Sequence, residues 1–370
     1  MEDLSIVFAG GHAATTAYSV LGEIKSLGLP WEVHFIGAKS AVEGKRVPTL
    51  ESKLFVGEGV KFHGLIAGRI QRRFTFWTIP SLFKIPVSFV HAFILLRRIK
   101  PKVILSFGGF VGFPVIAVGK LLGIPTILHE QTAAAGRANR ASSFFAQTVT
   151  LARKCSRKYF APKKTKVIGN PILPFFAKIK PKRSLGAPPT IYITAGSRGS
   201  VTINSAVFEI LKKLLADFKV IHQAGPLEKS KFKKMKDNLP VALSDNYRVF
   251  GQTKPERLKE IYSQADMVIS RAGANSVAEI IAARRPAILI PIPWSYLDEQ
   301  SKNARFAARF GIARILNQGA LTGRKLLKEI LMLKEDWEKI QSNVKNKKSP
   351  DINASKLMVD ILESQLGRVK

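Results

Sequence analysis

Cysteine is nearly absent from this 370-residue sequence, which contains one, at position 155. An internal disulfide is therefore excluded, and a chain without disulfides suits a reducing compartment. Cysteines cannot supply a zinc site, and the six histidines do not cluster at the spacing of metal ligands. We therefore expect neither a metal nor a cofactor. The N-terminus lacks the basic segment and apolar run of a signal peptide, so we expect the chain to stay in the cytoplasm.

Acidic residues are also scarce. The sequence has 26 Asp and Glu against 59 Lys and Arg, which gives a formal net charge of +33. A positive field of this size attracts polyanions such as nucleic acid, anionic lipid or phosphate-bearing substrates. The charge alone does not distinguish among them. The hydrophobic fraction of 46% excludes disorder for the bulk of the chain.

Long uninterrupted hydrophobic runs are missing. The segment Phe74–Leu96 approaches the ~20 apolar residues that span a bilayer. It contains Lys84, Pro80 and Pro86, which oppose a transmembrane helix. A buried helix fits this segment, and a membrane-surface helix fits better because basic residues flank it on both sides. The residues expected to dock on an anionic membrane are Phe76, Trp77, Phe83, Arg72, Arg73, Arg97 and Arg98.

What the sequence does contain is a regular alternation of short apolar runs and helical stretches. The expected strands are residues 4–9, 31–36, 103–106, 126–129 and 148–151, and then 190–195, 219–223, 247–250, 267–270 and 287–291. This alternation predicts an α/β protein with two Rossmann-like, doubly wound parallel sheets. We expect an N-terminal domain over 1–172, a linker rich in proline and lysine over 173–188, and a second domain over 189–350. A C-terminal helix over 351–370 is free to pack back on the first domain.

In the first half, glycine pairs follow two predicted strands. Gly10 and Gly11 precede His12, at a position where backbone N–H groups can approach a phosphate. His12 has a near-neutral pKa suited to a general base. A plain tight turn with a surface histidine also fits these residues.

Polar residues that follow the strand at 126–129 complete a predicted acceptor pocket, because the carboxyl ends of parallel strands share one edge of a sheet. Helix capping explains Thr132 equally well. The predicted acceptor and diphosphate site comprises Gly10, Gly11, Gly108, Gly109, His129, Gln131, Thr132, Asn139 and Asn170. The predicted catalytic residues are His12 and Glu130.

The second half repeats this arrangement. Arg198 lies in a glycine loop before a helix and could neutralise a diphosphate with paired N–H donors. Glu279 lies one turn into another helix, where a carboxylate can accept ribose hydroxyls while the helix N-terminus binds phosphate. A capped helix with a favourably placed carboxylate is the simpler alternative. The candidate ligand-binding residues of this half are Ser197, Arg198, Ala274, Asn275, Ser276, Val277, Glu279, Gln300 and Asn303.

Taken in order, the motifs resemble those of the MurG family of N-acetylglucosaminyltransferases. They are Gly-Gly-His at 10–12, Gly-Gly-Phe-Val at 108–111, His-Glu-Gln at 129–131, Ile-Gly-Asn-Pro at 168–171, Gly-Ser-x-Gly at 196–199, Arg-x-Gly-Ala-x-Ser-x-x-Glu at 271–279 and Asp-x-Gln-x-x-Asn-Ala at 298–304. The resemblance implies the GT-B fold and a metal-independent, inverting reaction. Ser197, residues 274–277, Glu279 and Gln300 match the family's donor positions.

The resemblance also implies the substrates and the place of action. N-acetylglucosamine would pass from UDP-N-acetylglucosamine to an undecaprenyl-diphosphate-linked N-acetylmuramyl pentapeptide, the lipid I to lipid II step of peptidoglycan synthesis. The implied partners are this donor, this lipid acceptor and an anionic membrane surface. The chain would act as a peripheral protein on the cytoplasmic face of the plasma membrane.

Departures from the family pattern keep two alternatives open. The first glycine loop is shorter, Leu173 replaces an arginine, and Thr132 replaces an asparagine. A related GT-B transferase with another lipid acceptor or UDP-sugar therefore fits as well. A non-catalytic basic protein that binds nucleic acid or membrane is supported by the net charge, but no nucleic-acid motif accompanies it. We expect no nucleic-acid partner, and the sequence leaves the oligomeric state open.

Overall fold

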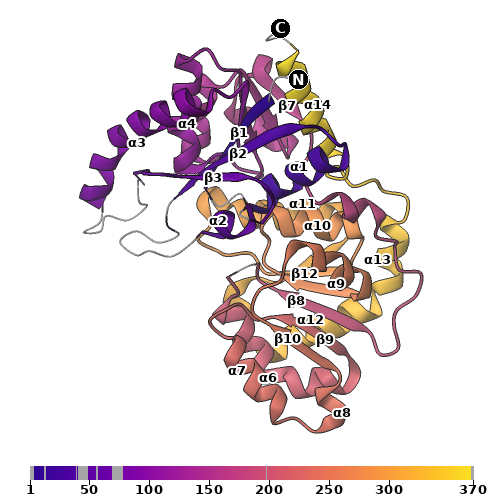
Figure 1. The fold of residues 1–370 in the computed structure, drawn as a ribbon. Helices are drawn as coiled ribbons and strands as arrows, with labels where there is room; N and C mark the ends of the chain where they lie inside the picture. Colours follow the sequence, from indigo (N-terminus) through magenta and orange to yellow (C-terminus); the bar gives the residue numbers. More distant parts are fainter. Residues whose placement is uncertain are drawn as a thin grey trace. The chain divides into compact units, whose positions relative to one another are not determined.

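The computed structural model describes residues 4–11, 14–38, 40, 49–55, 57–68, 78–196 and 198–367. The chain divides into two compact units (Figure 1). Unit 1 comprises Met1–Pro174 and Pro350–Lys370, and unit 2 comprises Phe175–Ser349. The C-terminal segment therefore belongs to the same unit as the N-terminus.

Within the described residues, unit 1 is built on a seven-stranded sheet of order β3-β2-β1-β4-β5-β6-β7, with every neighbouring pair parallel. The strands are β1 (Leu4–Ala9), β2 (Trp31–Ala38), β3 (Lys61–Leu65), β4 (Val103–Ser106), β5 (Thr126–Glu130), β6 (Thr148–Leu151) and β7 (Thr165–Val167). The central strands β1, β4 and β5 are almost entirely buried, which explains their continuous apolar character.

Helices pack on the sheet of unit 1. They are α1 (Ala14–Ser26), α2 (Leu50–Phe55), α3 (Thr78–Ile99), α4 (Gly109–Leu121), α5 (Arg137–Phe145) and α14 (Ala354–Leu366), with the 3₁₀ helices η1 (Lys154–Tyr159) and η2 (Pro162–Lys164). Ala92 and Leu96 of α3 join Val115 of α4 in one core cluster with the strands. The helix α14 packs against α1 and β4. Among the described residues, no helix has both the length and the apolar character needed to cross a bilayer.

Unit 2 contains a second parallel sheet of order β10-β9-β8-β11-β12-β13. Its strands are β8 (Thr190–Thr194), β9 (Lys219–Gln223), β10 (Tyr247–Phe250), β11 (Met267–Ser270), β12 (Ala287–Leu289) and β13 (Ala313–Ile315). Its helices are α6 (Val201–Asp217), α7 (Lys229–Asp237), α8 (Val241–Ser244), α9 (Leu258–Gln264), α10 (Ala274–Ala283), α11 (Glu299–Phe310), α12 (Gly323–Glu335) and α13 (Trp337–Val344), with the 3₁₀ helices η4 (Pro255–Arg257), η5 (Tyr296–Asp298) and η6 (Gln318–Ala320). The predicted class of two doubly wound parallel sheets is confirmed.

The segment between the two sheets is ordered. A 3₁₀ helix, η3 (Pro174–Lys178), lies within the stretch that the composition predicts to be a linker. Phe176 is fully buried, and its ring centroid lies 5.1 Å from that of Tyr262 in an edge-on contact. Residues 175–188 therefore belong to unit 2, and Phe176 anchors them to it.

A buried ion pair fixes the C-terminal segment to unit 1. Arg153, just after β6, donates to Asp351 through Nη1 at 2.5 Å and through Nη2 at 2.9 Å. Both side chains are buried, and Asp351 Oδ1 also accepts from the Asn170 backbone N–H at 2.7 Å. Such a pair is stable only while both charges are present, because a single buried charge is costly. One carboxylate thus joins segments from three parts of the chain.

Candidate functional site

In unit 1, glycine turns meet at the carboxyl ends of neighbouring strands. Gly11 follows β1 and donates its N–H to the carbonyl of Gly108, which follows β4, at 3.3 Å. A Cβ atom on Gly109 would lie 3.2 Å from the Gly11 carbonyl oxygen. The backbones of the two turns are therefore in contact. Because glycine has no side chain, a ligand can also approach the peptide groups of these turns closely.

Asn139, in the first turn of α5, holds the second glycine turn. Its Oδ1 accepts from the Gly109 N–H at 3.0 Å, and its Nδ2 donates to Glu130 Oε2 at 2.7 Å. Gly108 has φ +84, and a Cβ there would lie 2.0 Å from Asn139 Oδ1. Only glycine fits at this position.

Glu130, predicted as catalytic, ends β5 and is 2% exposed. Its carboxylate accepts from Thr132 N–H at 3.0 Å, Thr132 Oγ1 at 2.8 Å and Gly136 N–H at 3.3 Å, besides the amide of Asn139. Burial raises the pKa of Glu130, while these hydrogen bonds act in the opposite direction. The carboxylate thus accepts hydrogen bonds from the loop that follows it. These bonds fix the position of that loop.

His129 is fully buried beside Glu130. Its Nδ1 lies 3.0 Å from Thr150 Oγ1 of β6. Burial lowers the pKa of His129 to about 4; Arg153 also lowers it, and a hydrogen bond with the Asn170 side chain opposes both. The imidazole is therefore neutral at pH 7 and ties β5 to β6 and to the segment after β7.

Two predicted acceptor residues face other partners. Gln131 Oε1 accepts from Thr16 Oγ1 of α1 at 2.8 Å. Gly10 donates its N–H to the Ile36 carbonyl of β2 at 3.2 Å. The structure thus places the predicted acceptor residues of β1, β4 and β5 along one sheet edge. Other predicted residues, namely His12, Ser197, Arg72, Arg73, Phe76 and Trp77, lie outside the described part of the chain.

In unit 2, the loops after β8 and β9 are pressed together. Gly199 has φ +75, and a Cβ there would lie 2.3 Å from the Ala224 carbonyl oxygen. Ser200 caps α6 by accepting from the Ile203 N–H at 3.4 Å. Arg198 is exposed on this loop. The cationic side chain is therefore accessible beside a helix N-terminus, as an anion site requires.

Arg271, the first residue of the Arg-x-Gly-Ala motif after β11, connects the N-cap of α6 to the residue that follows β12. Its Nη2 donates to Ser200 Oγ at 2.7 Å, and its Nη1 donates to the Ile290 carbonyl at 3.2 Å. Burial lowers the pKa of this guanidinium, which is 8% exposed.

The helix α10 begins after Gly273, and the predicted residues Ala274 to Val277 form its first turn. Glu279 follows and is 8% exposed. Tyr262 donates its hydroxyl to Glu279 Oε2 at 3.3 Å. Burial raises the pKa of Glu279 to about 7, and this hydrogen bond only partly opposes it. Burial therefore disfavours the charged form of this carboxylate, and further hydrogen-bond donors would stabilise it.

Two amides of α11 bind backbone groups near α10. Gln300 Oε1 accepts from the Ile292 N–H at 3.1 Å, after β12. Asn303 Nδ2 donates to the Ala272 carbonyl at 3.1 Å, and Asn303 is 2% exposed. The structure therefore brings Arg271, Gln300 and Asn303 to the carboxyl ends of β11 and β12, where α10 starts.

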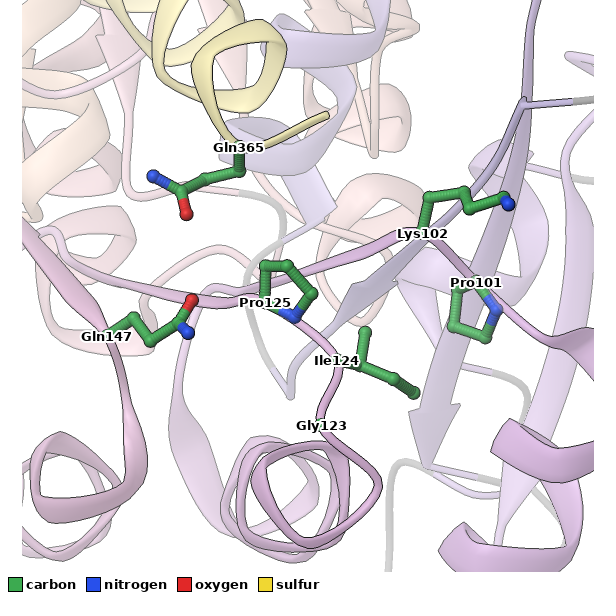
Figure 2. Close-up of a pocket in the computed structure, with 7 residues that line it drawn as sticks. All are labelled: Pro101, Lys102, Gly123, Ile124, Pro125, Gln147 and Gln365. Carbon is green, nitrogen blue, oxygen red and sulfur yellow. The ribbon is translucent and has the colours of Figure 1, made fainter. Parts of the chain in front are cut away.

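A cavity of about 370 Å³ lies elsewhere in unit 1. Figure 2 shows the residues around it, which are Pro101, Lys102, Gly123, Ile124, Pro125, Gln147 and Gln365. Most of them precede β4, β5 or β6, so the cavity lies at the amino ends of these strands. It is separate from the sheet edge that carries the predicted acceptor residues.

The outer face of α3 is apolar and basic. Phe83 is 73% exposed, Val90 61% and Ile94 56%. Arg97 and Arg98 are exposed at the end of the helix. Exposed apolar residues gathered on one helix face with adjacent cations are typical of interaction surfaces.

Comparison with known proteins agrees with the sequence motifs. The glycosyltransferase family 28 N-terminal domain matches residues 23–151, and the family 28 C-terminal domain matches residues 190–358. A UDP-N-acetylglucosamine–N-acetylmuramyl-(pentapeptide) pyrophosphoryl-undecaprenol N-acetylglucosamine transferase from Legionella pneumophila (strain Paris) is 31% identical over 352 residues, covering 92% of each chain. This chain belongs to the MurG family of glycosyltransferases. The predicted family is thereby confirmed.

Another relative and two solved structures support the same family and fold. The enzyme of the same name from Clostridium perfringens (strain ATCC 13124) is 30% identical over 360 residues, covering 94% of this chain and 95% of the relative. The crystal structure of Acinetobacter baumannii MurG superposes with a TM-score of 0.69 at 23% identity, covering 97% of this chain and 99% of that one. The kitacinnamycin glycosyltransferase reaches 0.68 at 15% identity. This MurG family member therefore has the GT-B fold.

Proposed function

We propose that this chain transfers N-acetylglucosamine from UDP-N-acetylglucosamine to the 4-hydroxyl of a lipid-diphosphate-linked N-acetylmuramyl pentapeptide. This is the step from lipid I to lipid II in peptidoglycan synthesis. The observation that carries the proposal is the start of α10 with the buried Glu279 behind it. It lies in a chain whose relatives at 30–31% identity bear the name of this transferase.

The donor binds to unit 2 in this proposal. The N-terminus of α10 accepts the diphosphate, because its first N–H groups point at the anion. Glu279 accepts the ribose hydroxyls and thereby gains the donors that its burial demands. Ser197 and Arg198 supplement the diphosphate contacts, while Gln300 and Asn303 shape the loops that face the sugar.

Arg198 and the helix N-termini of unit 2 stabilise the negative charge of the departing UDP. Arg271 holds the N-terminus of α6 and the residue after β12 in place through its two hydrogen bonds. The loops therefore keep their geometry as charge develops, which is the basis of electrostatic preorganisation.

The acceptor binds to the glycine turns of unit 1. Gly11 and Gly109 present backbone groups to the acceptor diphosphate, and Asn139 fixes the second turn. Glu130 acts here as a positioning residue for that loop. The acceptor hydroxyl must lose a proton, and on the sequence alone we assign this task to His12.

The outer face of α3 is the membrane-docking element of the proposal. Phe83, Val90 and Ile94 enter the lipid interface, while Arg97 and Arg98 face anionic headgroups. The enzyme would then act as a peripheral protein at the cytoplasmic face of the plasma membrane, where its lipid acceptor resides.

Turnover and thermal stabilisation test the function together. UDP-N-acetylglucosamine should raise the Tm more than UDP-glucose or UDP-galactose, and EDTA should leave both the shift and the turnover unchanged. The variant His12→Ala should keep the shift but lose about 10²- to 10⁴-fold in turnover with a lipid I analogue. Preference for another UDP-sugar would change the assigned donor, and loss of activity in EDTA would refute metal independence. Absence of any UDP-induced shift would refute the donor site.

A further inference from the structure

Residues 131–174 contain nine basic residues and no acidic one. Arg153 is buried against Asp351. The remaining eight belong to α5, η1, η2, β7 or the turns beside them: Arg137, Arg140, Lys154, Arg157, Lys158, Lys163, Lys164 and Lys166. All are exposed except Lys164, which is half-buried. Ordinary surfaces intersperse both signs of charge, whereas this segment contributes positive charges alone.

Contacts with aromatic residues unite these elements into one surface. Arg140 Cζ of α5 lies 6.0 Å from the centroid of the Tyr159 ring of η1, and Lys158 Nζ lies 5.2 Å from the same centroid. Lys164 Nζ of η2 donates to the Phe144 carbonyl of α5 at 3.3 Å. Phe144 itself is 81% exposed. We call this the α5–η2 surface, and its members are Arg137, Arg140, Phe144, Lys154, Arg157, Lys158, Tyr159, Lys163 and Lys164.

Aromatic contacts connect the α5–η2 surface to α3. The ring centroid of Phe145 lies 6.1 Å from that of Phe113 on α4, and Phe113 lies 5.6 Å from Phe89 on α3. The helices α3 and α4 pack together, as do α4 and α5. The α5–η2 surface therefore belongs to the same helical layer as the exposed apolar face of α3.

We propose that the α5–η2 surface is a second membrane contact, which binds anionic lipid headgroups and inserts Phe144 at the interface. A basic residue close to an anionic membrane contributes about 1 kcal/mol of binding. An exposed phenylalanine among cations suits the boundary between headgroups and acyl chains. Duplex nucleic acid would contact the charges through its phosphates but has no unstacked base to place against Phe144. The proposal rests on the proposed membrane-associated function, but lipid binding is measured without turnover.

Vesicle binding of matched variants tests this proposal. The variant Arg140→Ser/Lys158→Ser/Lys164→Ser removes three charges from the α5–η2 surface. Its control, Lys233→Ser/Lys234→Ser/Lys236→Ser, removes three charges from α7 of unit 2. On vesicles of phosphatidylglycerol and phosphatidylcholine, the first variant should bind about 100-fold more weakly than the unmodified chain, from three contributions of about 1 kcal/mol. The control should lose less than about threefold.

Further comparisons separate the alternatives. Phe144→Ser should weaken binding to the same vesicles without changing the net charge. Equal losses for the two triple variants would overturn the proposal, because binding would then follow net charge alone. Weaker binding to duplex DNA with unchanged vesicle binding would assign the surface to nucleic acid instead. Circular dichroism spectra and thermal unfolding transitions that match those of the unmodified chain establish that the variants are folded. A chain without transferase activity that still shows the vesicle pattern would refute the proposed function and leave this proposal standing.

Discussion

Replacing Glu279 by glutamine is expected to stabilise unliganded unit 2 at neutral and alkaline pH. Burial raises the pKa of this carboxyl to about 7, from an ordinary value of 4.5. A group with a raised native pKa contributes its full stability below the unfolded pKa. It loses that contribution as the pH rises through the native pKa. Glutamine carries no proton to lose, so the variant avoids this loss.

The size of the effect follows from the two pKa values. A pKa difference of one unit corresponds to about 1.4 kcal/mol, so a rise from 4.5 to about 7 gives about 3 kcal/mol. The free energy of unfolding of Glu279→Gln, minus that of the unmodified chain, should therefore increase by about 3 kcal/mol between pH 4.5 and pH 8. UDP binding should weaken by about 10- to 100-fold, because hydrogen bonds to a charged acceptor are lost.

Urea unfolding followed by tryptophan fluorescence measures this difference. Trp337 is 1% exposed in unit 2 and donates Nε1 to the Asp266 carbonyl at 3.0 Å, so its emission reports on this unit. Glu260→Gln serves as the control, because Arg248 lowers the pKa of the exposed Glu260 and the pH trend should have the opposite sign. Parallel stability profiles for Glu279→Gln and the unmodified chain would refute the reasoning.

Two further substitutions test unit 1. Gly108→Ala should lower the free energy of unfolding by about 2 to 4 kcal/mol, because the new Cβ adds backbone strain and overlaps the buried Asn139 amide. The control is Gly123→Ala, where φ is +73 but a Cβ would have nothing within 4 Å, and it should lower the free energy of unfolding by only about 1 to 2 kcal/mol. Equal losses in the two variants would contradict the overlap. Asp351→Asn should lower the free energy of unfolding, measured by chemical denaturation, by about 3 to 5 kcal/mol, because it leaves the buried Arg153 without its charge partner. The control is Asp360→Asn at an exposed position. A similar loss in the control would show that the effect is not specific to the buried pair.

The fold was predictable because buried parallel strands leave a direct record in the sequence. The strands β1, β4 and β11 are buried along their whole length or nearly so, and each appears as an apolar run followed by a glycine turn. The order of the motifs identified the family for the same reason, since each motif follows a strand of one of the two sheets.

The roles of individual side chains in unit 1 were less accessible. Glu130 was predicted as catalytic, yet its partners include Asn139, which the sequence gives no reason to pair with it. The ion pair of Arg153 and Asp351 joins residues 198 positions apart, and no local sequence pattern predicts it. Such contacts depend on how helices pack on the sheet, and periodicity alone carries no information about that packing.

Two of the buried glutamates, Glu130 and Glu279, show which part of a site is available to a ligand. Both have raised pKa values because burial disfavours the charged form. Glu130 receives three hydrogen bonds from the loop that follows it and a fourth from Asn139 of α5, so its desolvation is compensated within unit 1. Glu279 receives a 3.3 Å bond from Tyr262, and further donors would stabilise its charged form. Ribose hydroxyls are such donors, which is why we assign substrate contact to Glu279 and positioning to Glu130.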